Sequence, residues 1–189
     1  MRRGFKSWCE RTAAEYRRSL GVALGDRLDP RDLATSLGVR VARPEELPML
    51  SPNSLAQLTR AGADHWSAVT VSQGGKTLVI LNSGHPPTRQ ANSLAHELAH
   101  IILNHTSAQV QLSSEGFLFR ASFDSEQEAE ADWLAGCLLA PRDDLLYAWR
   151  RSRDTAALAT RFGISKALTT WRMHMTGVEK QVGNRGRAP

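Results

Sequence analysis

Cysteine and long apolar stretches are both scarce in this chain, and each shortage excludes a class of protein. Two cysteines in 189 residues are too few for a disulfide-stabilised scaffold, so reduced thiols are expected. No run of about eighteen apolar residues occurs, which leaves no candidate for a membrane-spanning helix. The basic N-terminus lacks the apolar core of a secretory signal. Together these shortages favour a cytoplasmic protein.

Negative charge is scarce in the C-terminal part of the sequence. The whole chain has a formal net charge of +5, and residues 142–189 hold ten Lys and Arg against four Asp and Glu. A basic patch can attract nucleic acid or an acidic protein, although a solvated basic surface is the commoner meaning of so small an excess. The length allows one well-buried domain, with or without a small appendage.

One motif of strong chemical meaning is present, the H-E-x-x-H formed by His96, Glu97 and His100. Residues four apart lie on one face of an α-helix, so both imidazoles can reach one metal ion. Glu97 follows the first histidine, at the position of the general base in zinc peptidases. The surrounding residues 91–104 have apolar side chains at helical spacing, as expected for a helix that packs on a core.

Two core histidines, hydrogen-bonded within the fold, are the alternative explanation of this motif. Burying three ionisable groups side by side costs several kcal/mol unless a metal or another partner compensates. The metal site is therefore the favoured interpretation. Zinc suits a set of nitrogen and oxygen ligands with an open position, and Mn²⁺ or Fe²⁺ is the alternative.

The rest of the chain predicts helices and a small sheet. Helices are expected at residues 8–18, 30–37, 124–139, around 145–149, 155–162 and 165–175, and strands at 39–42, 66–72 and 76–82. Gly74 and Gly75 predict a hairpin between the last two strands. Residues 43–62 are expected to be loop with room for one helical turn, and 104–122 a polar loop near the cleft. The strand at 76–82 either offers its edge to an extended substrate peptide or lies in the core of the sheet.

A catalytic zinc site needs a third protein ligand and an open position for water. The acidic helix at 124–139 offers Glu126, Glu128, Glu130 and Asp132. Glu128 and Asp132 share one helix face, so Glu128 could complete a His-His-Glu set while Asp132 accepts a hydrogen bond from the outer ring N–H of a histidine. Glu126 is typical of a solvated helix N-terminus. For Glu130, a solvated position and a role at the metal site are equally favoured.

A second electrophile usually helps to stabilise the oxyanion during peptide hydrolysis. The candidates by residue type are His65, His105, Arg120 and Tyr147. Each of these types is more often an ordinary surface or core residue, and the sequence does not choose among them.

Four blocks of sequence resemble the ImmA/IrrE metallopeptidases. They are LVILNS (78–83), SLAHELAH (93–100), EAEAD (128–132) followed by CLLAP (137–141), and LATRFGIS (158–165). The resemblance covers about residues 33–178. In that family the two histidines and the glutamate thirteen residues before the proline of the LLxP block bind zinc, which implies that Glu128 is the third ligand. Leu134 and Ala140 depart from the residues common in the family, and neither belongs to the metal set.

The resemblance also implies the fold and the division of the chain. It implies an α+β, gluzincin-like metallopeptidase domain, in which a small antiparallel sheet packs on the H-E-x-x-H helix and on a second, ligand-bearing helix. Residues 1–141 would form this core with its N-terminal helices. Residues 142–178 would form a helical segment with helix-turn-helix spacing packed on the core, and 179–189 a disordered tail.

The function implied by the resemblance is that of a soluble intracellular peptidase with one Zn²⁺ per chain. Members of the family typically cut helix-turn-helix repressors, which implies a narrow-specificity endopeptidase that switches on a stress-response or mobile-element programme. The alternative is a non-proteolytic regulator that binds DNA or a repressor or toxin partner, with a structural or vestigial metal site. Direct DNA binding is less favoured, because Lys166 and Arg172 are the main base-reading candidates in the 158–175 segment.

Overall fold

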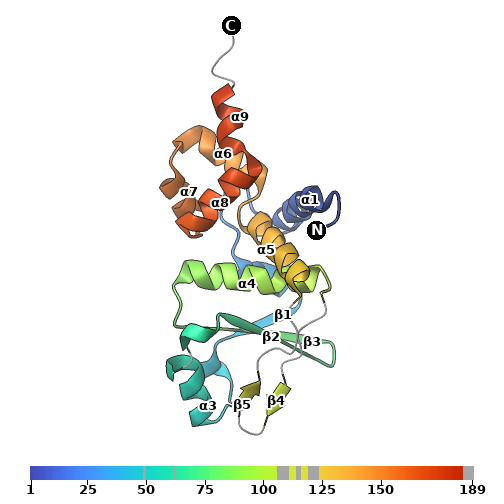
Figure 1. Cartoon of the computed structure of the whole chain (residues 1–189), viewed down its shortest axis with the longest axis vertical. Coiled ribbons are helices and arrows are strands. Elements are labelled where there is room, and N and C mark those ends of the chain that lie inside the picture. Colours follow the sequence, from blue (N-terminus) through green and yellow to red (C-terminus); the bar gives the residue numbers. More distant parts are fainter. Residues whose placement is uncertain (49, 62, 106–110, 114–115, 119–123, 185–189) are drawn as a thin grey trace.

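The computed structural model describes residues 1–189 except 49, 62, 106–110, 114–115, 119–123 and 185–189. The described elements are stacked along the long axis of the molecule (Figure 1). A small sheet is covered by α4 (Pro87–Ile102), α5 (Ser125–Leu139) crosses α4, and α1 (Phe5–Ser19) lies beside α5. The helices that follow α5 form the end opposite the sheet. None of the described helices is long and apolar enough to cross a membrane.

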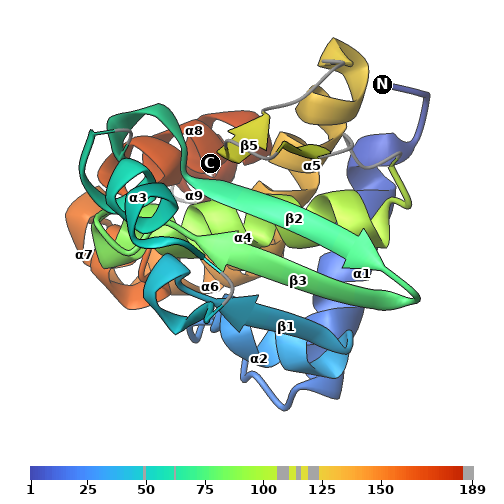
Figure 2. The same cartoon turned by 90° about the horizontal axis from the view of Figure 1, so that it is seen from below.

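The sheet has three strands in the spatial order β1, β3, β2. These are β1 (Val39–Ala42), β2 (Ala68–Gln73) and β3 (Lys76–Leu81). The hairpin β2–β3 is antiparallel as predicted, but β1 runs parallel to β3, so the sheet is mixed rather than antiparallel. The direction differs because the long segment between β1 and β2 crosses the sheet before the hairpin begins. β3 is central and β2 is an edge strand (Figure 2), so the interpretation of β3 as an edge that receives substrate is wrong.

The two faces of the sheet contact separate hydrophobic clusters. Val79 and Leu81 of β3 belong to the main cluster, which includes α4 and α5, whereas Ile80 belongs to a second cluster with Trp66 and Leu58. This division follows from the two-residue period of a strand. The expected loop at 43–62 is more helical than predicted, because this segment covers the second face. It contains η1 (Pro44–Glu46), α3 (Pro52–Ala56) and η2 (Gln57–Ala61), and η3 (Ala63–His65) follows.

Helix α5 forms the centre of the main cluster. Its residues from Trp133 to Leu139 are all buried, and it packs against both α4 and α1. After Pro141 the chain continues as α6 (Arg142–Ser152), α7 (Thr155–Phe162), α8 (Lys166–Thr176) and α9 (Val178–Asn184). The disordered tail expected from residue 179 is therefore helical as far as Asn184, and residues 185–189 lie outside the described part.

Two buried arginines attach these C-terminal helices to the rest of the chain. Arg17 of α1 donates to Asp144 of α6 at 2.8 Å, and the side chains are only 4% and 9% exposed. Arg172 of α8 is completely buried and donates to Glu10 at 2.7 Å and to the carbonyl oxygen of Ala140 at 2.9 Å. Because a buried charge needs partners, the C-terminal helices are fixed against α1 and the end of α5.

Two further segments complete the described fold, one as predicted and one with added strands. α2 (Pro30–Ser36) begins as predicted, with Asp29 capping it by accepting the backbone N–H of Arg31. The polar loop expected at 104–122 contains, among its described residues, two antiparallel strands, β4 (Gln111–Ser113) and β5 (Gly116–Leu118). The division of the chain at residue 141 stays a prediction.

Candidate metal centre

Helix α4 presents the two histidines of the H-E-x-x-H motif toward α5. Leu94 and Leu98 are 1% and 0% exposed and attach one face of α4 to the main cluster. His96 and His100 lie on a different face and are partly buried, with side chains 21% and 16% exposed. The helical period therefore produces both features at once, a buried apolar face and a pair of imidazoles in register.

Helix α5 brings Glu128 to the two histidines. The carboxylate of Asp124 accepts the backbone N–H groups of Glu126 and Gln127 and so caps the helix at its start. Because α5 begins at Ser125, Glu128 lies in its first turn, where α5 crosses α4. A carboxylate in the first turn is also favoured by the helix dipole.

The three predicted ligands converge on one point. The Nε2 atoms of His96 and His100 are 3.0 Å apart, and they lie 3.3 and 3.4 Å from the two carboxylate oxygens of Glu128. Zinc binds such ligands at about 2.0–2.2 Å, which requires about 3.3–3.5 Å between ligand atoms at tetrahedral corners. The two distances to Glu128 match this spacing, and the two Nε2 atoms, 3.0 Å apart, are slightly closer than it requires. The cluster of His96, His100 and Glu128 could hold a metal ion.

The outer nitrogen of His96 is held by Asp132, one turn beyond Glu128. Asp132 Oδ1 lies 2.8 Å from His96 Nδ1, which makes that nitrogen the donor and leaves Nε2 to face Glu128. Burial lowers the pKa of His96, but the hydrogen bond and charge of Asp132, with the charges of Glu97 and Glu128, outweigh burial and raise this pKa above 6.5. A metal ion at this site therefore competes with a proton.

Glu97 is held by Thr70, a residue that sequence reasoning did not find. Thr70 Oγ1 donates to Glu97 Oε2 at 2.5 Å, from the edge strand β2 to the motif helix. The two-residue period of strand β2 could have indicated this contact. Thr70 is two residues from Ala68, so both side chains lie on the face of β2 that packs against the main cluster and α4. Glu97 thus lies beside the ligand set with one of its oxygens fixed.

The structure describes three of the four oxyanion candidates, and their surroundings differ. His105 contacts Nδ1 of His100, on the far side of that ring from Glu128. Tyr147 packs on Gly25, and the guanidinium of Arg151 covers its ring at 3.5 Å, so Tyr147 does not belong to the site. His65 is exposed and has no hydrogen-bond or ion-pair partner among the described residues. Arg120 lies outside the described residues.

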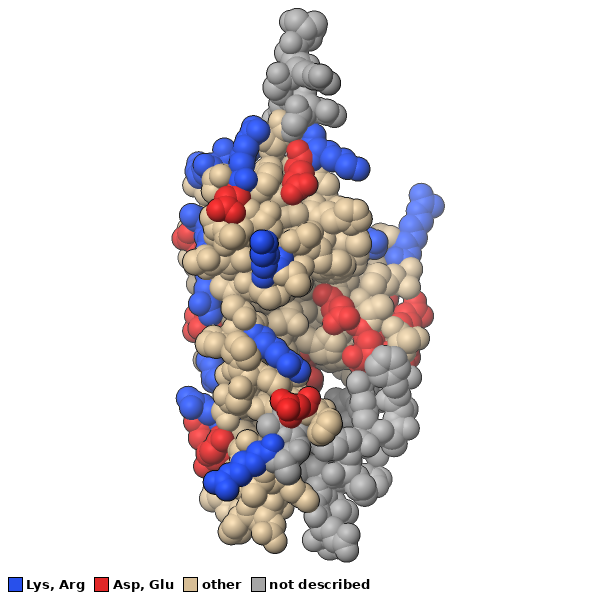
Figure 3. Space-filling view, turned by 60° about the vertical axis from the view of Figure 1, so that its left-hand side comes forward, with Lys and Arg blue, Asp and Glu red and all other residues tan. Residues whose placement is uncertain are grey.

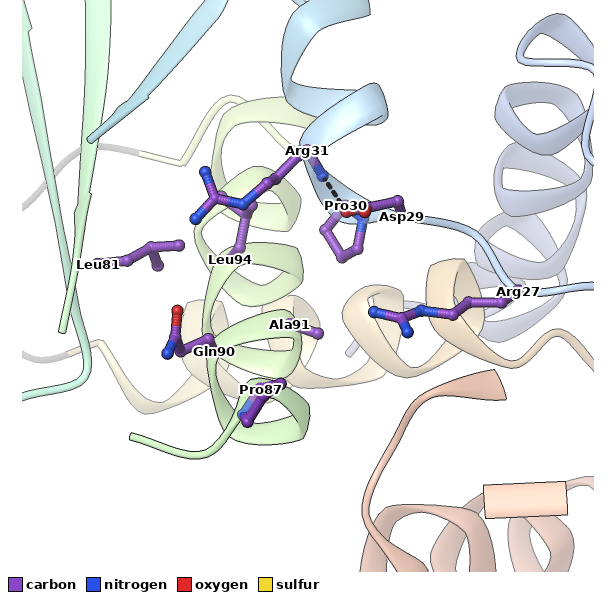
Figure 4. Close-up of a pocket in the computed structure, with 9 residues that line it drawn as sticks. All are labelled: Arg27, Asp29, Pro30, Arg31, Leu81, Pro87, Gln90, Ala91 and Leu94. Carbon is purple, nitrogen blue, oxygen red and sulfur yellow. Dashed lines mark hydrogen bonds between the residues drawn. The ribbon is translucent and has the colours of Figure 1, made fainter. Parts of the chain in front are cut away.

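A pocket of about 150 Å³ lies on a different face of α4 (Figure 4). Gln90 and Leu94 line it from α4, and the exposed side chains of Arg27 and Arg31 approach it from the segment around the start of α2. Leu94 is two residues from His96, so the two side chains point to opposite sides of the helix. This pocket is therefore separate from the metal centre.

The profile of the M78 peptidases, described as an IrrE N-terminal-like domain, matches residues 53–174. The chain belongs to this family. The match confirms the resemblance to the ImmA/IrrE proteins, and it includes α4, α5 and the edge strand β2. Membership indicates a metallopeptidase, and the family is associated with zinc.

A solved structure gives an independent view of the fold. A Mycobacterium tuberculosis transcriptional regulator is similar to this M78-family chain, with a TM-score of 0.54 and 16% sequence identity. The similarity covers 87% of this chain and 46% of the regulator, so the chain spans about half of the regulator's length. At this identity the likeness concerns the fold alone. The comparison with curated protein sequences gives no match.

Proposed function

We propose that this M78-family protein is a zinc-dependent endopeptidase in which His96, His100 and Glu128 hold the metal and Glu97 is the general base. The observation that carries the proposal is the convergence of ligand atoms from His96, His100 and Glu128 next to a separately held carboxylate. Bound Zn²⁺ would polarise a peptide carbonyl and acidify water in the site.

The residues of the chain supply the proton transfers. Thr70 fixes one oxygen of Glu97, so the other oxygen can accept the proton of the attacking water and then deliver it to the leaving amine nitrogen. Glu97 is not in the ligand set, so its replacement by glutamine removes the base and leaves the three ligands in place.

The edge strand β2 is the proposed guide for the substrate backbone. Among the described strands β2 pairs only with β3, and Thr70 on β2 contacts the proposed base. The free edge of β2 can therefore pair with an extended peptide and hold it close to Glu97. A peptide must be extended to pair in this way, so a folded substrate has to expose a flexible segment before it is cut.

We further propose that the substrate is a DNA-binding repressor. The support is the ImmA/IrrE family, together with the name of the similar transcriptional regulator. Selection of one extended segment at one edge strand would give the narrow specificity that release of a repressor requires.

The alternative function, DNA binding by the C-terminal helices, has weaker support. Of the two base-reading candidates, Arg172 is completely buried and pairs with Glu10, which leaves Lys166 exposed on α8. On the face shown in Figure 3, basic and acidic side chains of the described residues are interspersed along the molecule. Such a surface offers little for either base readout or phosphate contacts. Tight, salt-dependent binding of duplex DNA by the purified protein would favour this alternative.

The test compares newly formed protein N-termini in host cells that express the wild type or Glu97→Gln at equal abundance. The matched control is Glu126→Gln, because Glu126 is 66% exposed and loses the same charge outside the ligand set. The proposal predicts that a DNA-binding protein is cut with the wild type and the control, and not with Glu97→Gln. Identical N-termini for all three proteins, in cells that still respond to the protein, would refute it.

A further inference from the structure

We infer that His105 and Glu130 are positioning residues that fix the tautomer of His100 and hold its ring toward the metal. The inference rests on the proposed metal centre and assigns a function to two side chains outside the ligand set. His105 Nδ1 lies 3.0 Å from His100 Nδ1, and His105 Nε2 lies 3.4 Å from Glu130 Oε2. The three side chains form one hydrogen-bond chain, which begins at Nδ1 of His100, on the side of that ring away from Glu128.

The end of α4 explains why His105 lies against His100. Asn104 has a left-handed backbone with φ of 51°, its N–H donates to the carbonyl of Ile101, and the N–H of His105 donates to the carbonyl of His100. These two bonds define a Schellman motif, in which the second residue after the helix cap usually contacts the residue five positions earlier through apolar side chains. Here that pair is His105 and His100, and the imidazole rings are 5.1 Å apart at 67°.

The hydrogen positions along this chain follow from the requirement for a metal ligand. His100 must present an unprotonated Nε2 to the metal, so its Nδ1 carries the proton and donates. His105 Nδ1 is then the acceptor, so His105 carries its proton on Nε2. That nitrogen donates to Glu130, which as a carboxylate can only accept. Every group in this chain then has one role, and these roles are consistent with His100 binding through Nε2.

The two histidine ligands are therefore supported in different ways. His96 contacts a carboxylate directly, but that carboxylate, Asp132, is 68% exposed. His100 reaches its carboxylate through His105, and the side chains of His105 and Glu130 are 8% and 17% exposed. The support of His96 is the shorter and more direct bond, whereas the support of His100 is better shielded from water.

The first test measures zinc affinity by competition with a chelator. His105→Leu removes the acceptor but keeps an apolar side chain at a position of the Schellman motif that usually holds one, so the helix end should still form. We expect a loss of zinc affinity of about 10- to 100-fold. His105→Asn places an oxygen where Nδ1 was and should recover most of this loss. His174→Leu, which removes an exposed histidine on α8, should have no effect.

The second test removes the carboxylate at the other end of the chain. Glu130→Ala should weaken zinc binding, whereas Glu126→Ala, which removes a 66% exposed carboxylate from the same helix, should not. Equal zinc affinity in the wild type, His105→Leu and Glu130→Ala would overturn the inference. So would equal losses in His105→Asn and His105→Leu, because a purely steric role for His105 does not depend on an acceptor.

The third test reads the tautomers directly. Nitrogen NMR of the zinc-loaded wild type should show His105 protonated on Nε2 and unprotonated on Nδ1, and the reverse tautomer would overturn the inference. None of these readouts uses peptidase activity. A wild type that binds no zinc would refute the proposed function itself, whereas normal zinc binding with unchanged variants would refute only the roles of His105 and Glu130.

Discussion

The contact between Thr70 and Glu97 leads to a quantitative prediction about catalysis. Thr70→Val keeps the shape and the strand preference of the side chain but removes the hydroxyl that donates to Glu97. The carboxylate of Glu97 is then free to rotate about its last torsion, which has a broad energy minimum. Ligand geometry should not change, because Thr70 lies on β2 whereas the three proposed ligands lie on α4 and α5.

The size of the effect follows from the kind of hydrogen bond that is lost. A hydrogen bond to a charged group contributes about 1.5–3 kcal/mol, and the partial exposure of both side chains favours the lower half of this range. Each 1.4 kcal/mol of transition-state stabilisation corresponds to about a tenfold change in rate. We therefore expect kcat to fall about 10- to 50-fold in Thr70→Val if the full bond is used in the transition state.

The assay is cleavage of an identified substrate by purified, zinc-loaded protein, with zinc content and thermal unfolding measured on the same samples. Thr77→Val is the matched control, because Thr77 lies on the adjacent strand β3 and, among the described residues, its hydroxyl has a hydrogen bond with Ser72 alone, at 3.1 Å. The control should retain wild-type kcat. A kcat for Thr70→Val within twofold of the wild type, at equal zinc content, would refute the claim that Thr70 orients the base.

Three further predictions follow from the ionisable groups. Asp132→Ala should weaken zinc binding about tenfold, at the low end of the range for such outer hydrogen bonds because Asp132 is 68% exposed; unchanged affinity in chelator competition would contradict this. Asp144→Ala leaves Arg17 buried without its carboxylate and should lower the free energy of unfolding by about 3–5 kcal/mol, measured by urea titration. The raised pKa of His96 means that its protonation stabilises the metal-free protein below pH 6.5 and that this contribution is lost as pH rises through the raised pKa. Zinc competes with the same proton, so zinc affinity should fall as pH is lowered through that pKa.

The convergence of His96, His100 and Glu128 could be predicted from the sequence because its signals are local or family-specific. His96 and His100 lie one turn apart on a helix with a clear apolar face, and Asp124 marks the start of the helix that presents Glu128. The structure brings these residues together as the spacing and the family register required. The β2–β3 hairpin was likewise predictable, because Gly74 supplies the positive φ of its turn.

The parts that were missed depend on contacts between distant segments. The parallel position of β1 is set by a long connection whose helices cover the second face of the sheet, and no short pattern in that segment specifies this. The contact of Thr70 with Glu97 spans 27 positions and exists only because α4 packs on the face of β2 that bears Thr70. The position of His105 is different: Asn104 at the end of the predicted helix is a local signal for a Schellman motif, and it would have paired His105 with His100.

The most direct test of the metal centre is anomalous diffraction at the zinc edge from crystals of the zinc-loaded protein. The account predicts one ion per chain at about 2.0–2.2 Å from the Nε2 atoms of His96 and His100 and from a carboxylate oxygen of Glu128. An ion bound elsewhere, or no ion at this point in protein that contains stoichiometric zinc, would contradict the account.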